Sequence, residues 1–334
     1  MRTKRALRRA RDGVVAVLVP YLRRHPRHLE RLLEAVRLVS HDASRARLYR
    51  SFSWPLVQAI DVRLTVATPG GPMEVDTGDV VGRVIAVSGT WEPNATAIVR
   101  RLLAPGDVFV DLGAHTGYYT LLAAHIVGAE GHVFAFEPSP ARYRELLANL
   151  SRSTVTNVSA FDVGAGSGAT TATLYEAPRP NTGASTLTSG ALARPAVATS
   201  TEYRPVAVRV VAAESLLPHD LLERVRVVKV DVEGYEIEAI QGIERLLGSG
   251  APLAVLVEVS PAWSGGAPVW VERLCARHGL EPWLVSNEYT LAGYFPARLQ
   301  PPVPLASIPH DRCDLLLVRG MDVVVVAGAA GASS

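Results

Sequence analysis

The chain has 334 residues, 48% of them hydrophobic and 20% charged, which fits one large folded domain with a buried core and excludes a disordered protein. A formal net charge of only +2 gives no general reason to expect a nucleic acid as partner. Cys275 and Cys313 are too few for a disulfide framework and lack zinc-ligand spacing, which predicts two thiols in the reducing cytoplasm. No apolar run approaches the roughly 20 residues of a membrane-spanning helix.

The first 92 residues predict an extension in two parts. Residues 1–55 predict helices, because apolar side chains recur on one helix face with arginines opposite. The members of that face are Leu29, Leu32, Leu33, Val36 and Leu38. Residues 56–92 predict a β-hairpin lead-in, because β-branched and polar residues alternate around the turn at 69–72. A short helix is expected to start near Asn94.

Residues 93–322 alternate strand and helix patterns, and an Ala/Thr/Ser/Gly-rich insertion at 164–205 interrupts them before a tail at 323–334. The insertion is either a functional segment or a mobile loop. Strands are predicted at 107–112, 132–136, 157–162, 226–231, 253–258, 282–286 and 313–319, and helices at about 118–128, 139–150, 234–247 and 267–279. Buried strands separated by helices predict a Rossmann-like α/β fold with a seven-stranded, mostly parallel sheet and helices on both faces.

A glycine loop follows the first of these strands in "VFVDLGAHTGYYTLLAA". Gly113 and Gly117 give the spacing G-x-x-x-G, which is not the G-x-G-x-x-G of dinucleotide sites, and no G-K-[ST] is present for a phosphate loop. Asp111 ends the strand, and a carboxylate there repels phosphate and favours a cation. S-adenosylmethionine carries a sulfonium and an ammonium and has no phosphate, so this loop favours it over a dinucleotide.

Two further strand ends suit an adenosine cofactor. Glu137 lies about twenty positions beyond the loop, where an acidic residue binds ribose hydroxyls. Pro138 then ends the strand, and Ser139 is a plausible N-cap for the next helix. Asp162 and Val163 end the third strand and are expected near the adenine. A ribose acid suits both NAD and S-adenosylmethionine, so Glu137 alone does not separate them.

The segment "VVKVDVEGYEIEAIQGIERLL" places Lys229 and Asp231 on one strand face, because side chains alternate with period two. Glu233 and Glu236 follow at the same strand end. Three acids at one edge need partners or a functional reason. A lysine-paired arrangement is preferred to a magnesium site, although two carboxylates and water would suit magnesium.

The chain resembles the FkbM-type S-adenosylmethionine-dependent methyltransferases over most of residues 85–320. The resemblance is carried by the D-x-G-A-H-x-G-x-x-[ST] loop and K-x-D-V-E-G, with "SGTWEPNATAIVRRLL", "VFAFEPSPARYRELLANL" and "LAVLVEVSP" in the same order. It implies a class I methyltransferase fold whose last strand is antiparallel, and O-methylation of a hydroxyl on a natural product, sugar or glycoconjugate. One departure is Glu214-Ser215, where members often carry a "T-L-D" aspartate.

The same resemblance assigns roles to single residues. The implied cofactor residues are Asp111, Gly113, Ala114, His115, Gly117, Glu137 and Pro138, with Asp162 or Val163 near the adenine. Asp231 and Glu233 would face the methyl group. As general base we expect Asp231 first, then Glu233 and His115, with His310 in reserve. Lys229, Glu258 and Tyr289 are expected on the substrate side, and no resident metal is expected.

Three alternatives remain open on the sequence. An NAD-dependent oxidoreductase or epimerase would share the fold but lacks its glycine spacing here. A nucleic-acid methyltransferase would commonly carry Asp/Asn-Pro-Pro-aromatic after the fourth strand, where this chain has Asp231-Val232-Glu233-Gly234. A degenerate binding module without activity is the third alternative. From the resemblance and the near-neutral charge, we expect the partner to be a small molecule that carries a hydroxyl, and we do not expect a nucleic acid.

Overall fold

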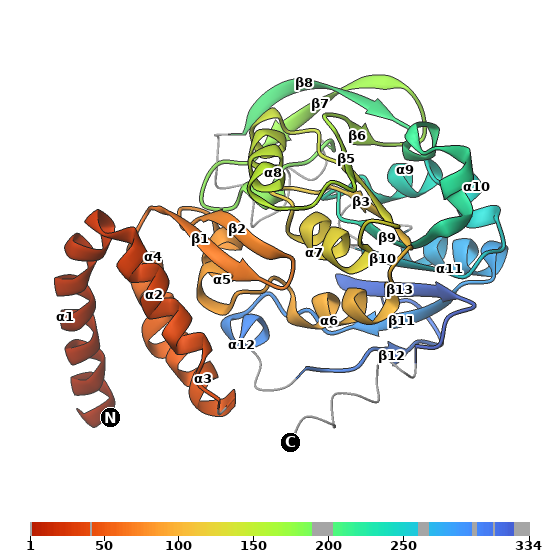
Figure 1. Cartoon of the computed structure of the whole chain (residues 1–334). Coiled ribbons are helices and arrows are strands. Elements are labelled where there is room, and N and C mark those ends of the chain that lie inside the picture. The colour runs from red at the N-terminus through yellow and green to blue at the C-terminus, as the bar shows by residue number, and fades with distance from the viewer. Residues whose placement is uncertain are drawn as a thin grey trace. The chain divides into compact units, whose positions relative to one another are not determined.

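The computed structural model describes residues 2–40, 42–188, 203–259, 267–295, 299–309 and 311–323 (Figure 1). Internal contacts divide the chain into two compact units. The smaller unit consists of Met1–Trp91, Arg179–Asn181 and Glu288–Arg298. The larger unit consists of Glu92–Pro178, Thr182–Asn287 and Leu299–Ser334. In the described part of the chain, no helix has both the length and the apolar character needed to cross a bilayer.

The smaller unit combines helices with one hairpin. Its helices are α1 (Arg2–Arg24), α2 (Pro26–Arg37), α3 (Asp42–Leu48), the π-helical turn η1 (Tyr49–Ser53), α4 (Trp54–Gln58), α5 (Val80–Ser88) and α12 (Leu291–Tyr294). The hairpin joins β1 (Arg63–Thr68) to β2 (Gly71–Asp76) in an antiparallel pair that closes at Thr68 and Gly71. The predicted hairpin and its turn are therefore confirmed.

Two details of this unit differ from the sequence prediction. Leu29, Leu33 and Val36 are buried, but Leu38 is 78% exposed because α2 has already ended at Arg37. The β-branched stretch at 80–88 is helix α5 rather than an extension of the hairpin. The Asp79 carboxylate accepts the Val81 N–H at 3.0 Å, so a good N-cap outweighs the low helix propensity of valine.

The larger unit holds an eight-stranded sheet in the order β12-β11-β13-β10-β9-β3-β4-β5. Its strands are β3 (Val108–Leu112), β4 (His132–Phe136), β5 (Val158–Phe161), β9 (Val225–Val230), β10 (Leu253–Val259), β11 (Glu281–Val285), β12 (Val303–Pro304) and β13 (Cys313–Arg319). β13 pairs antiparallel with both β10 and β11, as expected for the last strand. The seven predicted strands are present, and the prediction missed the two-residue edge strand β12.

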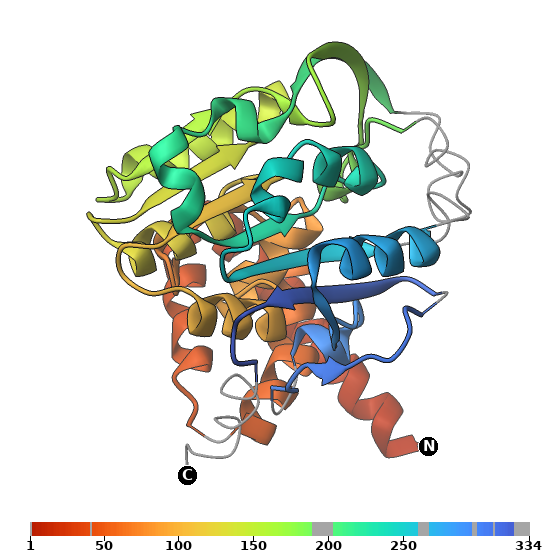
Figure 2. The same cartoon turned by 90° about the vertical axis from the view of Figure 1, so that its right-hand side faces the viewer.

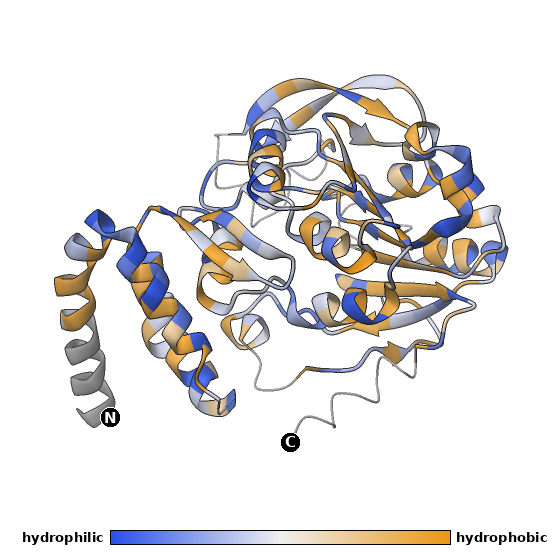
Figure 3. Cartoon of the chain, in the orientation of Figure 1, coloured by the Kyte–Doolittle hydropathy of each residue, from blue (hydrophilic) through white to orange (hydrophobic). Residues whose placement is uncertain are grey.

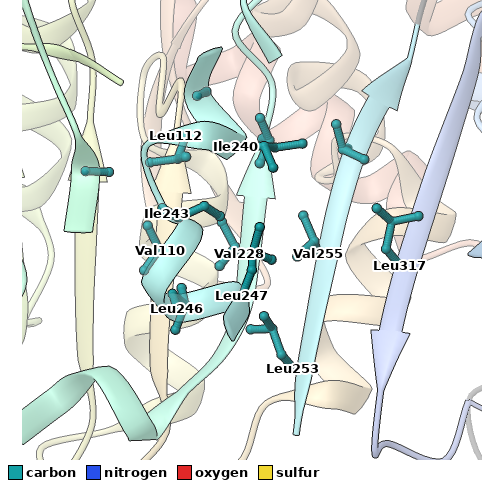
Figure 4. Close-up of a cluster of buried hydrophobic side chains, with 14 of the residues drawn as sticks. Val110, Leu112, Val228, Ile240, Ile243, Leu246, Leu247, Leu253, Val255 and Leu317 are labelled. Atoms are coloured by element: carbon teal, nitrogen blue, oxygen red, sulfur yellow. The ribbon is translucent and has the colours of Figure 1, made fainter. Parts of the chain in front are cut away.

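One face of this sheet is apolar and is covered by α9 (Glu236–Gln241), α10 (Glu244–Gly248) and α11 (Ala267–His278), the layer that Figure 2 faces. Hydrophobic residues dominate the central strands in Figure 3. Figure 4 shows Val110, Val228, Val255 and Leu317 from four strands packed with Leu246 of α10. At about 25 cal/mol per Å² of apolar surface, each such side chain contributes about 1.5–3 kcal/mol.

The predicted helix 234–247 is two helices, because Gly242 interrupts it. A Cβ at Gly242 would lie 2.0 Å from the Gly166 carbonyl oxygen, so the chain passes too close there for any larger residue. Ile240 and Ile243, on either side of the break, are both buried in the apolar cluster.

The opposite face of the sheet is covered by α6 (Pro93–Leu102), α7 (Tyr118–Val127) and α8 (Pro140–Arg152). A small cluster of Ala114, Ala135 and Leu146 joins the glycine loop, β4 and α8 on this side. Helices therefore cover both faces, as predicted.

The insertion 164–205 is more regular than its composition suggests. It contributes β6 (Gly164–Ala165), β7 (Thr170–Glu176) and the start of β8 (Arg204–Val211), which form a separate three-stranded sheet in the order β6-β8-β7. The alternation in "TTATLYE" and "RPVAVRVV" is the signal that the sequence prediction passed over. Residues 189–202 lie outside the described part of the chain.

Candidate active site

The glycine loop turns at the carboxyl end of β3, and its two glycines are required by close contacts. Gly113 has φ +86°, and a Cβ there would lie 1.8 Å from the carbonyl oxygen of Asp231. Gly117 has φ +93° and caps α7, and a Cβ there would lie 2.6 Å from Leu146 of α8. Both positions need glycine for the packing of the protein itself. Ala114, between them, is buried in the small apolar cluster.

Glu137 ties this loop to the end of β4. Its Oε2 accepts the His115 N–H and its Oε1 accepts the Ser139 N–H, both at 2.8 Å. Burial raises the pKa of Glu137 to about 7, and these two backbone hydrogen bonds limit the rise. The Ser139 hydroxyl accepts the Arg142 N–H at 3.3 Å, which confirms it as the N-cap of α8. Pro138, partly buried, separates the two.

His115 has a positive φ of 50°. Its Nε2 lies 3.2 Å from the Thr182 hydroxyl. The ring therefore contacts the segment that follows β7, while the backbone N–H of His115 donates to Glu137. Whether the ring nitrogen donates or accepts depends on the tautomer.

Asp162 and Val163 have structural partners at the end of β5. The Asp162 carboxylate is 64% exposed and pairs with Arg209 at 3.0 Å. Val163 is 3% exposed and packs into the large apolar cluster. An adenine contact by either residue stays a prediction, and it would require Asp162 to leave an exposed ion pair, which is a weak interaction.

Lys229 is the central cation on the sheet face that carries Asp111, opposite the large apolar cluster, and we call this face the polar face. Its Nζ lies 2.7 Å from Oδ2 of Asp231, and the register of β3 and β9 sets it directly beside Asp111. The ammonium also lies 5.0 Å from the centre of the Tyr119 ring. The predicted pairing of Lys229 with an acid is thus observed.

These contacts shift the ionisation of the whole group. Burial would lower the pKa of Lys229, but the charges of Asp231, Asp111 and Glu92 outweigh it and raise that pKa. Burial would raise the pKa of Asp231, but the Lys229 ammonium holds it below its usual value. Burial raises the pKa of Asp111, although Lys229 and the Thr120 hydroxyl at 2.6 Å oppose the shift. Lys229 and Asp231 therefore form a charged pair at neutral pH.

A second group lies on β10 and β13. Glu258 and Asp314 are direct partners in this antiparallel pair, so their side chains share one face. Arg312 donates to Glu258 Oε2 at 2.5 Å. Burial raises the pKa of Glu258 to about 7 against the opposing charge of Arg312, and burial also raises the pKa of Asp314 well above its usual value.

The two acids after Asp231 have different roles. The Glu236 carboxylate accepts the Gly234 N–H with both oxygens, at 2.9 and 3.1 Å, which is a structural cap at the start of α9. Glu233 has φ 51°, and its carbonyl accepts the Thr186 hydroxyl at 2.6 Å. Burial, followed by the charges of Glu258 and Asp231, raises the pKa of the Glu233 carboxyl well above its usual value.

Glu92 was not predicted from the sequence, although "WEP" contains it. Its side chain is 7% exposed, and its Oε2 accepts the Tyr119 hydroxyl at 2.8 Å. Arg312 and Asp314 were also missed, and the signal for them is the predicted antiparallel last strand, whose start lies at the edge where the parallel strands end. Glu92, Tyr119, Arg312 and Asp314 complete the polar face around Lys229.

Two predicted residues are not joined to this group by the structure. Tyr289 belongs to the smaller unit, where its ring centre lies 6.5 Å from that of Trp91 and 6.3 Å from that of Tyr294. His310 lies outside the described residues. Their assignments as substrate contact and reserve base stay predictions.

The edge as a whole favours a cationic ligand. In the described part of the chain, buried carboxyl groups outnumber the cations Lys229 and Arg312 beside them, so the edge can accept further positive charge and disfavours phosphate. Within the described ranges, no group of three or more His, Cys, Asp or Glu side chains is placed to hold a metal ion.

Comparison with known proteins gives a family and a set of distant structures. The model of the methyltransferase FkbM domain matches residues 111–279. A methyltransferase FkbM from Methylobacillus flagellatus KT is 12% identical with a TM-score of 0.39, over 84% of this chain and 61% of that one. Trm5b from Pyrococcus abyssi is 11% identical with a TM-score of 0.38, over 77% of this chain and 55% of that one.

Aeropyrum pernix fibrillarin, in complex with natively bound S-adenosyl-L-methionine, is 14% identical with a TM-score of 0.35, over 67% of this chain and 73% of that one. The chain thus spans about three fifths of the length of the Methylobacillus protein. A comparison with curated proteins finds no match. At these TM-scores the strand order itself, with β13 inserted antiparallel between β10 and β11, is the better description of the fold.

Proposed function

The chain belongs to the FkbM methyltransferase family, and from this premise we propose that it is an S-adenosylmethionine-dependent O-methyltransferase. The proposed acceptor is a hydroxyl of a small molecule, such as a natural product, a sugar or a glycoconjugate. The observation that carries the proposal is the hydrogen bond from the His115 N–H to Glu137, which joins the glycine loop directly to the proposed ribose acid. We further propose a cytoplasmic protein, consistent with its two free thiols, Cys275 and Cys313.

Glu137 has the capacity to bind ribose hydroxyls. Each of its carboxylate oxygens accepts one backbone N–H, and a carboxylate has about four acceptor sites in total. Capacity is therefore left for the two hydroxyls of a ribose. Its fixed orientation reduces the entropy lost when a ligand binds.

Asp111 fits the cationic part of the cofactor. Its side chain is 1% exposed, and Oδ2 accepts the Thr120 hydroxyl. The other oxygen, Oδ1, has no hydrogen-bond partner within the described ranges. A buried acceptor left unsatisfied costs about 1–3 kcal/mol, and a ligand ammonium would remove that cost. Gly113 and Ala114 line the same turn.

When bound, S-adenosylmethionine supplies an electrophilic methyl group, whose carbon–sulfur bond breaks as a bond to the acceptor oxygen forms and the hydroxyl proton passes to a base. Asp231 is our first candidate for the base that accepts this proton. Lys229 keeps the Asp231 carboxylate ionised and oriented, but by lowering its pKa it also makes Asp231 a weaker base. Orientation supplies most of the rate in such a displacement, and a base adds to it. Glu233 and His115 are the next candidates.

The test is a methyl-transfer assay that follows S-adenosylhomocysteine formation. Panels of monosaccharides, polyols and hydroxylated natural products are incubated with the protein, beside transfer RNA and ribosomal RNA. We expect formation with a hydroxylated small molecule and none above background with RNA. Methylation of RNA with all small molecules inert would overturn the acceptor class and would favour the nucleic-acid alternative.

A further inference from the structure

The polar face carries a continuous row of carboxyls at one edge of the sheet, which we call the acid row. It consists of Asp111 on β3, Asp231 just after β9, Glu258 on β10 and Asp314 on β13, four neighbouring strands. Lys229 is the register partner of both Asp111 and Leu256, and Glu258 is the partner of Asp314. Because side chains alternate along a strand, all four members of the row lie on the same face.

The row is only partly neutralised. Lys229 is engaged by Asp231 at 2.7 Å, and Arg312 contacts one oxygen of Glu258 while its own side chain is 47% exposed. Burial and the neighbouring acids raise the pKa values of Glu233 and Asp314 well above their usual range and that of Glu258 to about 7, so Lys229 and Arg312 do not keep these acids fully ionised. The described part of this edge therefore has room for one more positive charge, whose binding would favour the ionised form of these acids.

Glu258 shows where an additional cation would bind. Its side chain is 5% exposed, and Oε1 is buried without a hydrogen-bond partner in the part of the chain that the structure describes. A buried carboxylate oxygen left without a donor is costly. An ammonium would supply both the donor and the missing positive charge, whereas a neutral hydroxyl would supply only the donor.

The cofactor does not account for this position. Asp111 and Glu137, the residues proposed for the cofactor, lie on β3 and after β4, and β9 separates β3 from β10. Glu258 and Asp314 lie beyond Asp231, the residue proposed to face the transferred methyl group. They are thus on the acceptor's side of the reaction centre.

Resting on the proposed function, we propose that the acceptor carries an ammonium group close to the hydroxyl that is methylated, and that Glu258 and Asp314 bind this ammonium. The substrate class is an amino alcohol, of which a sugar with a free amine is the natural example. A carboxylated or phosphorylated acceptor is disfavoured, because the acid row repels it.

The experiment compares acceptors that differ only in charge. Titration with S-adenosylmethionine comes first, and a lack of binding there is a failure of the proposed function itself. With cofactor bound, glucosamine and galactosamine are then compared with their N-acetylated forms and with glucuronate, by calorimetry and by S-adenosylhomocysteine formation. We expect the free amines to bind at least about tenfold more tightly than their acetylated counterparts, the effect of one additional ion pair. Equal or weaker amine binding, including no binding by any of the five, overturns the inference and leaves the cofactor assignment intact.

Variants locate the preference. Glu258→Gln is expected to bring the ratio of amine to N-acetyl affinity close to one. Glu281→Gln is the matched control, because Glu281 is an exposed acid at the opposite edge of the same sheet, and the ratio should be unchanged. If circular dichroism shows that Glu258→Gln does not fold, the isosteric Asp314→Asn is used instead to measure the same affinity ratio. A ratio that stays high in both folded variants would contradict the assignment to Glu258 and Asp314.

Discussion

The two faces of strand β9 differ in what they hold, although their residues alternate along one short segment. Val228 and Val230 are buried in the apolar cluster under α9 and α10. Lys229, between them, is equally buried but faces Asp111 and pairs with Asp231. The apolar face gains stability from every side chain that it buries. The polar face costs desolvation energy, which its ion pairs only partly recover.

From the proposed function we infer that the polar face serves the reaction rather than stability. A sheet that needed only stability could carry apolar residues on both faces, as buried parallel sheets commonly do. Here the carboxyl edge instead combines a buried lysine, several buried carboxyls and a glycine loop whose turn depends on contact with Asp231. Three substitutions and one pH profile test this difference between the faces, ordered by the size of the expected effect.

Removal of the buried cation should have the largest effect. Lys229→Met leaves Asp231 and Asp111 without their ammonium, and breaking a buried pair in this way costs about 3–5 kcal/mol of the free energy of unfolding. Val228→Ala on the opposite face of the same strand should cost about 2 kcal/mol, from lost burial and a small cavity. Urea unfolding of both variants gives the comparison. A smaller loss for Lys229→Met than for Val228→Ala would contradict the role given to the charged pair.

Asp231→Asn tests the polar face for chemistry rather than stability. The amide keeps the shape of the side chain but loses the charge, so turnover should fall by about 100-fold or more. The affinity for S-adenosylmethionine should change by less than about threefold, because the residues proposed to bind the cofactor are Asp111 and Glu137. Steady-state kinetics and calorimetry separate the two, with the exposed Asp220→Asn as control. Turnover that stays within threefold of the parent would remove Asp231 from the mechanism.

Glu137→Ala tests the element that joins β4 to the glycine loop. It removes the proposed ribose contacts and the acceptor of the His115 N–H, so cofactor affinity should fall by about 10- to 100-fold. Glu130→Ala, an exposed acid in the turn before β4, is the matched control and should bind normally. Unchanged affinity in Glu137→Ala would exclude the ribose assignment.

The pH dependence of acceptor binding should give the smallest effect. The pKa of Glu258 is raised to about 7, so its ionised fraction rises about tenfold between pH 6 and pH 8. The charges that face Glu258 are Arg312, Asp231, Glu92, Glu233 and Asp314. An ammonium-bearing acceptor needs the carboxylate, so its KM should fall by up to about tenfold over this range. A KM that is flat in the parent, or that falls equally in Glu258→Gln, would contradict that role.

The positions of the candidate cofactor residues at one sheet edge could be predicted from sequence because the signals are local, while their role in binding stays a prediction. Asp111, Glu137 and Asp231 each end a strand whose apolar run is readable, and the ends of parallel strands meet at one edge. The Lys229–Asp231 pair needed only the two-residue period of a strand.

The acceptor side could not be predicted in the same way, because it depends on pairing between distant segments. Glu258 meets Asp314 only through the register of an antiparallel pair, and Glu92 meets Tyr119 through the packing of α6 on α7. The sequence pattern within each of these segments does not predict which residues of the other segment it will contact. Helix α5 was missed for a different reason, since β-branched residues favour a strand until a cap such as Asp79 is considered.

The central claim is that the glycine loop and Glu137 bind S-adenosylmethionine. Isothermal titration of the protein with S-adenosylmethionine and, separately, with NAD tests it most directly. We predict saturable binding of S-adenosylmethionine that is weakened by Glu137→Ala, and no binding of NAD. Binding of NAD without binding of S-adenosylmethionine would contradict the account.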